Sequence, residues 1–249
     1  MFKDGQLLQG WNGVVRIGDT VRRPARPWSR TVQSLLGHLA SKGFDAGPRP
    51  LGFDEQGREI VSYLAGSAEH YPWREFVYST DNLYRVARLL RRYHDLTVSF
   101  SIPRDAVWFA KVPGSPEAIC HGDIGPYNTV YVQQAAAALI DFDTAAPGPR
   151  IWDVAFAAYR FARVCELSTI PRLSEVYLHR VSRRIRRFCD YYGLEDRTTL
   201  LEVMLQRLEF QIFWLGAPAN LTTHRKAVAQ THAAFFVAKC GPSPGTRAS

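Results

Sequence analysis

One run of the sequence constrains the fold and the chemistry of this chain more than any other. It reads His-Gly-Asp-Ile-Gly-Pro-Tyr-Asn over residues 121–128 and continues as Ile-Asp-Phe-Asp over residues 140–143. Asp123 lies five residues before Asn128, and Asp141 follows thirteen residues after Asn128. Phosphoryl transfer from a nucleotide needs a carboxylate that orients and deprotonates the attacking hydroxyl, and an amide oxygen and a carboxylate that hold Mg²⁺. These three residues have the right types in the right order.

The whole run resembles the catalytic segment of the aminoglycoside phosphotransferase and choline kinase-like family, which are small-molecule kinases with a protein-kinase-like fold. In that family the segment reads His-Gly-Asp, four residues, Asn, a short hairpin, and then an apolar residue and the metal-binding Asp. The match continues through Gly148, Arg150 and the Trp-Asp-Val-Ala run over residues 152–155. The close resemblance covers roughly residues 119–160, and looser resemblance covers the remainder.

The resemblance implies roles for the polar residues of this segment. Asp123 is the expected catalytic base, which orients and deprotonates the acceptor alcohol. Asn128 and Asp141 are the expected Mg²⁺ ligands. His121 is expected to position the loop, and Asp153 to brace the catalytic segment and the helix that follows it.

Two further residues keep open roles. Asp143 either binds a second metal ion or caps the following turn, and Arg150 contacts either the nucleotide or Asp153. The motif also has a simpler interpretation, because Asp and Asn both favour turns and a lone Asp-x4-Asn pattern is common in loops. The order of all three residues, with His-Gly ahead of them and a strand pattern between them, favours the kinase-like interpretation.

The pattern of apolar residues predicts the elements that precede this segment. Short strands are expected over residues 6–24, where Pro24 stops the third strand. A helix is expected over residues 29–42, with its apolar residues on one face. A second hairpin is expected, with strands over residues 49–54 and 58–63. This order of three strands, a helix and two strands is typical of the small lobe of a kinase-like fold.

The resemblance therefore implies an α+β, bilobal protein-kinase-like fold. It would have a small antiparallel-sheet N-lobe with one helix and a larger, mainly helical C-lobe. Residues 1–66 would form the nucleotide-binding lobe and end in a hinge, and residues 67–249 would form the lobe with the catalytic loop and the acceptor-binding helices. The tail over residues 241–249 is rich in Gly, Pro and Ser and is expected to be disordered.

The small lobe is expected to bind ATP, the expected phosphoryl donor. Gly10, Asn12 and Gly13 lie where the family has its phosphate-covering turn. A glycine-rich turn lets backbone N–H groups approach phosphate oxygens. Tyr63 and Leu64 lead into the hinge, where the resemblance implies contact with the nucleotide base.

Two consecutive arginines on the third strand supply the expected cation. On the family's register Arg22 faces the phosphates and Arg23 points the other way, because consecutive strand residues face opposite sides. Alternatively, both are solvated cations of an edge strand. The helix over residues 29–42 contains no acidic residue to pair with this cation. Gln33 is the inward-facing polar candidate, and we expect it to hold a guanidinium weakly and a Glu in its place to strengthen the pairing.

The formal net charge of +8 raises the question of nucleic-acid binding. The excess is spread along the chain, and its densest cluster, from Arg180 to Arg187, forms the exposed face of one amphipathic helix. A nucleic-acid partner is therefore not expected. No run approaches the ~18 apolar residues of a membrane span. The start of the chain has no apolar signal region, and the four cysteines show neither metal-binding spacing nor a dense disulfide pattern. We expect a cytoplasmic protein.

These observations predict an ATP- and Mg²⁺-dependent phosphotransferase that acts on a hydroxyl of a small molecule. The alternative closest in fold is a pseudokinase scaffold that binds nucleotide without turnover, which the missing acidic partner favours. Nucleotidyl transfer or another group transfer on the same scaffold also stays open. Residues 151–249 carry fourteen basic against eight acidic residues. Because a pocket for polycationic aminoglycosides should be acidic, we expect a neutral, singly charged or partly apolar acceptor.

Overall fold

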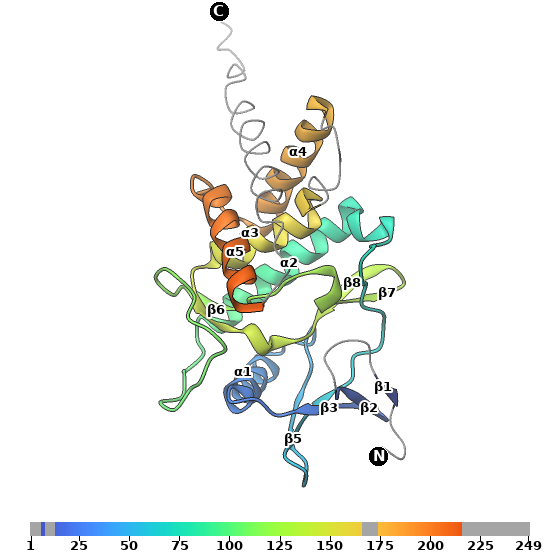
Figure 1. The fold of residues 1–249 in the computed structure, drawn as a ribbon, viewed down its shortest axis with the longest axis vertical. Coiled ribbons are helices and arrows are strands. Elements are labelled where there is room, and N and C mark those ends of the chain that lie inside the picture. Colours follow the sequence, from blue (N-terminus) through green and yellow to red (C-terminus); the bar gives the residue numbers. More distant parts are fainter. Residues whose placement is uncertain (1–5, 8–12, 166–173, 216–249) are drawn as a thin grey trace, which may run out of the picture.

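A computed structural model describes residues 6–7, 13–165 and 174–215. Figure 1 shows a sheet and helix α1 at one end of the molecule and helices α2, α3, α4 and α5 gathered at the other. The chain therefore has the two-lobed arrangement that the sequence predicts. Three predicted features lie outside the described residues and stay predictions: Gly10, Asn12 and the tail over residues 241–249.

The small lobe is an antiparallel sheet with one helix packed against it. The strands lie in the spatial order β1-β2-β3-β5-β4, and every neighbouring pair is antiparallel. Helix α1 (Ser29–Ser41) confirms the predicted helix and buries an apolar stripe with helical spacing, consisting of Val32, Leu35, Leu36 and Leu39. The strands are β1 (Gln6–Leu7), β2 (Val15–Ile17), β3 (Thr20–Pro24), β4 (Pro50–Phe53) and β5 (Arg58–Ser62).

Two short antiparallel pairs carry the catalytic motif at the edge of the large lobe. Strand β6 pairs with β9, and β7 pairs with β8. The His-Gly-Asp run follows β6, and the second Asp of the motif follows β8. The elements are β6 (Ala118–Cys120), η2 (Pro126–Asn128), β7 (Thr129–Val132), β8 (Ala135–Leu139), η3 (Phe142–Thr144) and β9 (Ala146–Gly148).

Helices form the body of the large lobe. Helix α3 packs against α5, α2 and α4, and most of its side chains are buried. On α4 the side chains of Val181, Ile185 and Phe188 are buried while its arginine-rich face is largely exposed, which confirms the predicted amphipathic helix. No helix in the described residues is both long and apolar enough to span a bilayer. The helices are η1 (Glu75–Tyr78), α2 (Thr80–Thr97), α3 (Arg150–Phe161), α4 (Glu175–Tyr192) and α5 (Leu200–Leu215).

Candidate active site

The loop that follows β6 is held from behind by a buried carboxylate. Asp153 of α3 accepts hydrogen bonds from the backbone N–H of His121 at 2.6 Å and of Gly122 at 2.9 Å. Gly122 has a φ of +84°, and a Cβ at this position would collide with the backbone oxygen of Thr144, so the loop favours glycine here. Asp153 therefore ties the loop to α3.

His121 supports the loop from inside the core. Its Nε2 lies 3.1 Å from the carbonyl oxygen of Ile140, and its Nδ1 accepts the backbone N–H of Asp123 at 3.4 Å. Burial lowers the pKa of His121, so the neutral ring is favoured. With its proton on Nε2, the ring donates to Ile140 and accepts from Asp123. It therefore positions the loop against the segment that leads to the second motif.

The carboxylate of Asp123 is oriented by three side-chain donors. The Tyr127 hydroxyl donates to Oδ1 at 2.7 Å, Gln211 Nε2 donates to Oδ1 at 3.2 Å, and Asn128 Nδ2 donates to Oδ2 at 3.0 Å. Burial raises the pKa of Asp123, while the hydrogen bond from Tyr127 acts in the opposite direction. A fixed carboxylate with a raised pKa suits a general base.

Asn128 and Asp141 both bring oxygen atoms to the lining of one cavity. Asn128 Nδ2 also donates to the backbone oxygen of Asp123 at 2.9 Å. Both hydrogen bonds of the Asn128 amide use Nδ2, and no described residue donates to Asn128 Oδ1. Asp141 adopts a left-handed backbone conformation, with φ 63° and ψ 71°, which is uncommon for a residue other than glycine. Mg²⁺ prefers carboxylate and other oxygen ligands, so this pair fits the predicted metal site.

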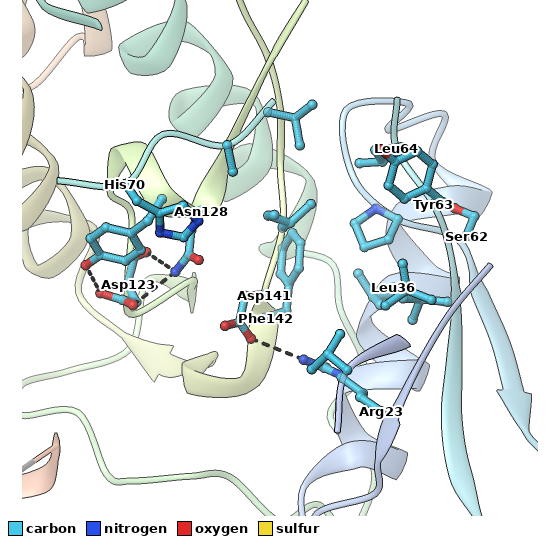
Figure 2. A pocket seen from close by; sticks show the side chains of 18 residues that line it. Arg23, Leu36, Ser62, Tyr63, Leu64, His70, Asp123, Asn128, Asp141 and Phe142 are labelled. Atoms are coloured by element: carbon cyan, nitrogen blue, oxygen red, sulfur yellow. Dashed lines mark hydrogen bonds and ion pairs between the residues drawn. The ribbon is translucent and has the colours of Figure 1, made fainter. Parts of the chain in front are cut away.

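A cation from the small lobe faces these oxygens. The Arg23 guanidinium lies 3.2 Å from Asp141, 2.6 Å from Asp143 and 2.8 Å from Glu59. Burial lowers the pKa of Arg23, but the three carboxylates outweigh it and raise the pKa, so the side chain stays charged. Burial also raises the pKa of Asp143 to about 6, although Arg23 opposes this shift. Figure 2 shows Arg23 reaching across to Asp141.

The prediction that Arg22 faces the phosphates and Arg23 points the other way is wrong. Arg23 lies opposite Glu59 in the ladder between β3 and β5, and it lines the site together with Val21. Arg22 points to the opposite face of the sheet and pairs with Asp54 at 3.5 Å. Because side chains alternate along a strand, an error of one residue in register exchanges the two arginines.

The acidic partner of Arg23 comes from β5 and not from α1. Glu59 is fully buried, and Gln33 Nε2 and Ser29 Oγ donate to it at 2.9 Å and 3.1 Å. Helix α1 therefore fixes the glutamate that holds the arginine. The predictions that Gln33 binds the guanidinium and that the cation lacks an acidic anchor are both wrong. A Glu at position 33 would face Glu59, so the expectation that it strengthens the pairing is also wrong.

A cavity of about 370 Å³ lies between the lobes, and Figure 2 looks into it. In Figure 2, Tyr63 and Leu64 lie on one side of the cavity and Asp123 and Asn128 on the other, with Asp141 between them. The structure therefore places the predicted hinge residues and the catalytic motif around one space. Apolar side chains complete much of its lining: Val14, Val21, Leu36, Pro48, Val61, Ala68, Val130, Ile140 and Phe142.

A second cavity, of about 480 Å³, also has Asp123 in its lining. Gly13 has a φ of 94° and precedes Val14, which lines both cavities. The two cavities share Val14, Arg23, Asp123, Tyr127 and Asp141, which form their junction. Aromatic, cationic and polar side chains dominate the remainder of the second lining: Pro24, Arg26, Trp28, Phe109, Asp143, Thr144, Arg160 and Gln211.

Arg150 lies outside the site. Its Nη1 donates to Asp95 at 2.6 Å and approaches the Tyr192 hydroxyl at 3.5 Å, and it lines neither cavity. Both predicted roles for Arg150, contact with the nucleotide and contact with Asp153, are therefore wrong. Asp143 does lie at the site, and its role as a ligand of a second metal ion stays a prediction.

Three residues of the site were not predicted from the sequence: Tyr127, Glu59 and Gln211. Tyr127 lies inside the motif, so its position four residues after Asp123 was a usable signal. Glu59 lies 36 residues from its partner on β3, and Gln211 lies 88 residues from Asp123. No local pattern marks either residue, because their roles depend on how distant elements pack.

Comparison with known proteins identifies similar chains. Residues 101–188 match the model of the phosphotransferase enzyme family. The trifolitoxin immunity protein of Rhizobium leguminosarum bv. trifolii is 34% identical over 195 residues, which cover 76% of this chain and 73% of that protein. A structure of glucosamine kinase in complex with glucosamine, ADP and inorganic phosphate has a TM-score of 0.64 at 17% identity, covering 95% of this chain and 81% of that one. The structure of macrolide 2′-phosphotransferase MphH from Brachybacterium faecium has a TM-score of 0.54 at 16% identity, covering 90% of this chain and 89% of that one. These structural similarities confirm the predicted bilobal fold.

Proposed function

Since this chain belongs to the phosphotransferase enzyme family, we propose that it transfers the γ-phosphate of ATP to a hydroxyl group of a small molecule. One observation carries the proposal. Asp123, Asp141 and Arg23 lie together at the junction of two cavities. The first cavity, lined by Tyr63 and Leu64, has the apolar walls that suit a nucleotide base. The second is left for the acceptor.

The residues at the junction divide the chemistry between them. Asp123 orients the acceptor hydroxyl and accepts its proton as the oxygen attacks the γ-phosphorus. A bond forms between that oxygen and the phosphorus, the bond from the phosphorus to the bridging oxygen breaks, and ADP carries away the electron pair. Tyr127 and Gln211 hold the base in orientation, and Arg23 faces the phosphates with a permanent positive charge.

Asn128 and Asp141 would hold Mg²⁺, because both offer oxygen atoms to the first cavity. When bound, the ion offsets negative charge on the phosphates. Arg23 already neutralises Asp141 from the small-lobe side at 3.2 Å. Asp141 would therefore be shared between Arg23 and the ion.

The alternative of a pseudokinase without turnover loses its main support. The missing acid on α1 motivated that alternative, and Glu59 supplies the carboxylate from β5. A test combines thermal unfolding with and without Mg·ATP and a screen for ADP release. The screen offers hydroxyl-bearing metabolites and antibiotics, including kanamycin-like compounds, to the wild type and to Asp123→Asn. We expect acceptor-dependent ADP release by the wild type alone. Nucleotide binding with no acceptor-dependent release across the screen would favour the pseudokinase.

A second candidate function is protection against a toxin. It is favoured by the relative with 34% identity, which is named as an immunity protein for trifolitoxin. On the proposed chemistry, protection would follow from phosphorylation of a hydroxyl on the toxin. Wild type and Asp123→Asn are expressed in a trifolitoxin-sensitive strain, and survival is compared. Protection by the wild type alone supports this function, and equal protection by both would separate immunity from phosphoryl transfer.

A further inference from the structure

The acceptor-side cavity contains an arginine that the proposed phosphoryl transfer does not use. Arg160 lies in the last turn of α3 and lines this cavity with Asp123, Tyr127 and Gln211. Its Nε is buried without a hydrogen-bond partner, and its Nη2 makes a long contact of 3.5 Å with Gln211. Within residues 6–7, 13–165 and 174–215, no carboxylate forms an ion pair with it.

The surroundings of Arg160 are aromatic. Its guanidinium carbon lies 4.9 Å from the ring centre of Phe156, 5.4 Å from that of Tyr159 and 5.6 Å from that of Tyr127. Aromatic faces attract a cation, but they do not satisfy its N–H groups. Burying a charge is costly unless it is paired and hydrogen-bonded. The side chain therefore presents unused donors beside a cavity.

Neutralising the catalytic base does not account for this arginine. The oxygens of Asp123 accept hydrogen bonds from Tyr127, Gln211 and Asn128, and neither nearby arginine donates to them. Another arginine, Arg207, is buried as a whole side chain, lies 4.6 Å over the same Phe156 ring, and has an Nε and Nη1 that also lack partners. Arg207 acts electrostatically on both Asp123 and Asp153, whereas Asp123 is the carboxylate that acts on Arg160.

We propose that Arg160 recognises a carboxylate on the acceptor, and that the substrate is a hydroxyl compound with such an anionic group. The planar guanidinium fork matches a carboxylate with two parallel hydrogen bonds. Trp28 and Phe109, whose rings meet edge to face at 5.1 Å, form an aromatic wall of the same cavity and would cover an apolar part of the acceptor. The inference rests on the proposed function and names its substrate class. A polycationic acceptor does not belong to this anionic class.

The test measures binding with matched probes. N-benzoylserine, mandelate and 4-hydroxyphenylacetate are each titrated against the primary amide of the same compound, with and without Mg·ATP. For at least one pair we expect the wild type to bind the acid about tenfold or more tightly than the amide, the value of a charge-assisted hydrogen bond. In Arg160→Met this preference should fall to about threefold or less. Arg184→Met is the matched control, because Arg184 is a half-buried arginine of α4 that lines neither cavity.

Each outcome decides the inference. It is overturned if no acid binds more tightly than its amide, or if the preference survives in Arg160→Met. It is also overturned if Arg160→Met weakens binding of Mg·ATP and leaves acid binding unchanged, because the arginine would then serve the nucleotide. Should Arg160→Met not fold, Arg160→Lys reports instead, since Lys keeps the charge without the planar fork and should lower the preference by about threefold or more. Binding of the acids can be measured without turnover. Failure of phosphoryl transfer would therefore be seen separately, as the absence of acceptor-dependent ADP release.

Discussion

Arg23 joins the two lobes electrostatically at the candidate active site. Its guanidinium contacts Glu59 in the small lobe and Asp141 and Asp143 in the large lobe. The Glu59 side chain is fully buried, so water does not compete with Arg23 for its carboxylate. The Asp141 side chain is more exposed. The arginine is thus anchored at its base and presents its outer nitrogens to the junction of the cavities, where a phosphate would compete for them.

We predict that Arg23→Ala weakens Mg·ATP binding by about 10- to 100-fold, the value of lost charge-assisted hydrogen bonds. Arg22→Ala is the matched control, because Arg22 pairs with Asp54 on the opposite face of β3. It should change the dissociation constant by about threefold or less. Calorimetric titration of both variants with Mg·ATP measures the effect. A larger loss in Arg22→Ala would reverse the assignment of the two arginines.

We predict that Asp123→Asn lowers turnover by about 10²–10⁴-fold, because it removes the base that accepts the hydroxyl proton. Binding of Mg·ATP should stay within about threefold, since Asn can keep the hydrogen bonds from Tyr127 and Gln211 at Oδ1. The measurement is ADP release with the best acceptor from the screen. Retention of more than about a tenth of wild-type turnover would remove Asp123 from the mechanism.

At the scale of single residues, the site residues that lie in one local segment could be predicted from the sequence. Their partners from distant segments could not. Asp123, Asn128 and Asp141 lie within one short run, so their spacing alone indicates that they act together. The two arginines of β3 are chemically identical neighbours, so composition cannot tell which one faces the site. Glu59 and Gln211 reach the site only through the packing of β5 and α5, which no local pattern records.

At the scale of elements, the ladder between β3 and β5 and the helix beside it form one unit. The sequence predicts the existence of both strands and of α1 from apolar periodicity, and their bounds agree closely with the structure. It does not predict that β5 lies between β3 and β4, because pairing order depends on contacts between separate segments. That order is what places Glu59 opposite Arg23 and within reach of Gln33.

We predict that Gln33→Glu lowers the free energy of unfolding by about 1–3 kcal/mol. The substitution replaces the donor to Glu59, 2.9 Å away, with a second carboxylate, and the hydrogen bond to the backbone oxygen of Ile60 is also lost. Gln56→Glu is the matched control, since Gln56 is exposed in the turn between β4 and β5. It should change stability by less than about 0.5 kcal/mol. Urea unfolding of both variants measures the difference, and a more stable Gln33→Glu would contradict the hydrogen-bond assignment.

At the scale of the whole molecule, Asp153 connects the catalytic loop to the helical body. It lies on α3, accepts two backbone N–H groups of the loop, and binds His94 Nε2 of α2 at 3.1 Å. Three segments that are distant in the sequence therefore meet at one buried carboxylate. Burial by itself pushes the pKa of Asp153 upward, but the hydrogen bond from His94 and the other contacts outweigh it and hold the pKa below the usual value of 3.8.

This shift has a definite sign for the pH dependence of folding. Because the folded pKa of Asp153 is depressed, its contribution is fully present above the unfolded value near 3.8 and is lost as the pH falls through the folded value. We predict that Asp153→Asn lowers the free energy of unfolding by about 1–3 kcal/mol at pH 7, because one buried donor loses its acceptor. The loss of stability of Asp153→Asn below about pH 4 should be shallower than that of the wild type.

The control is Asp81→Asn, at an exposed position of α2, which should stay within about 0.5 kcal/mol of the wild type at pH 7. Urea unfolding across the acid range measures the free energy of unfolding of each variant. If this free energy falls equally steeply below pH 4 in the wild type and in Asp153→Asn, protonation of Asp153 is not a source of the acid sensitivity.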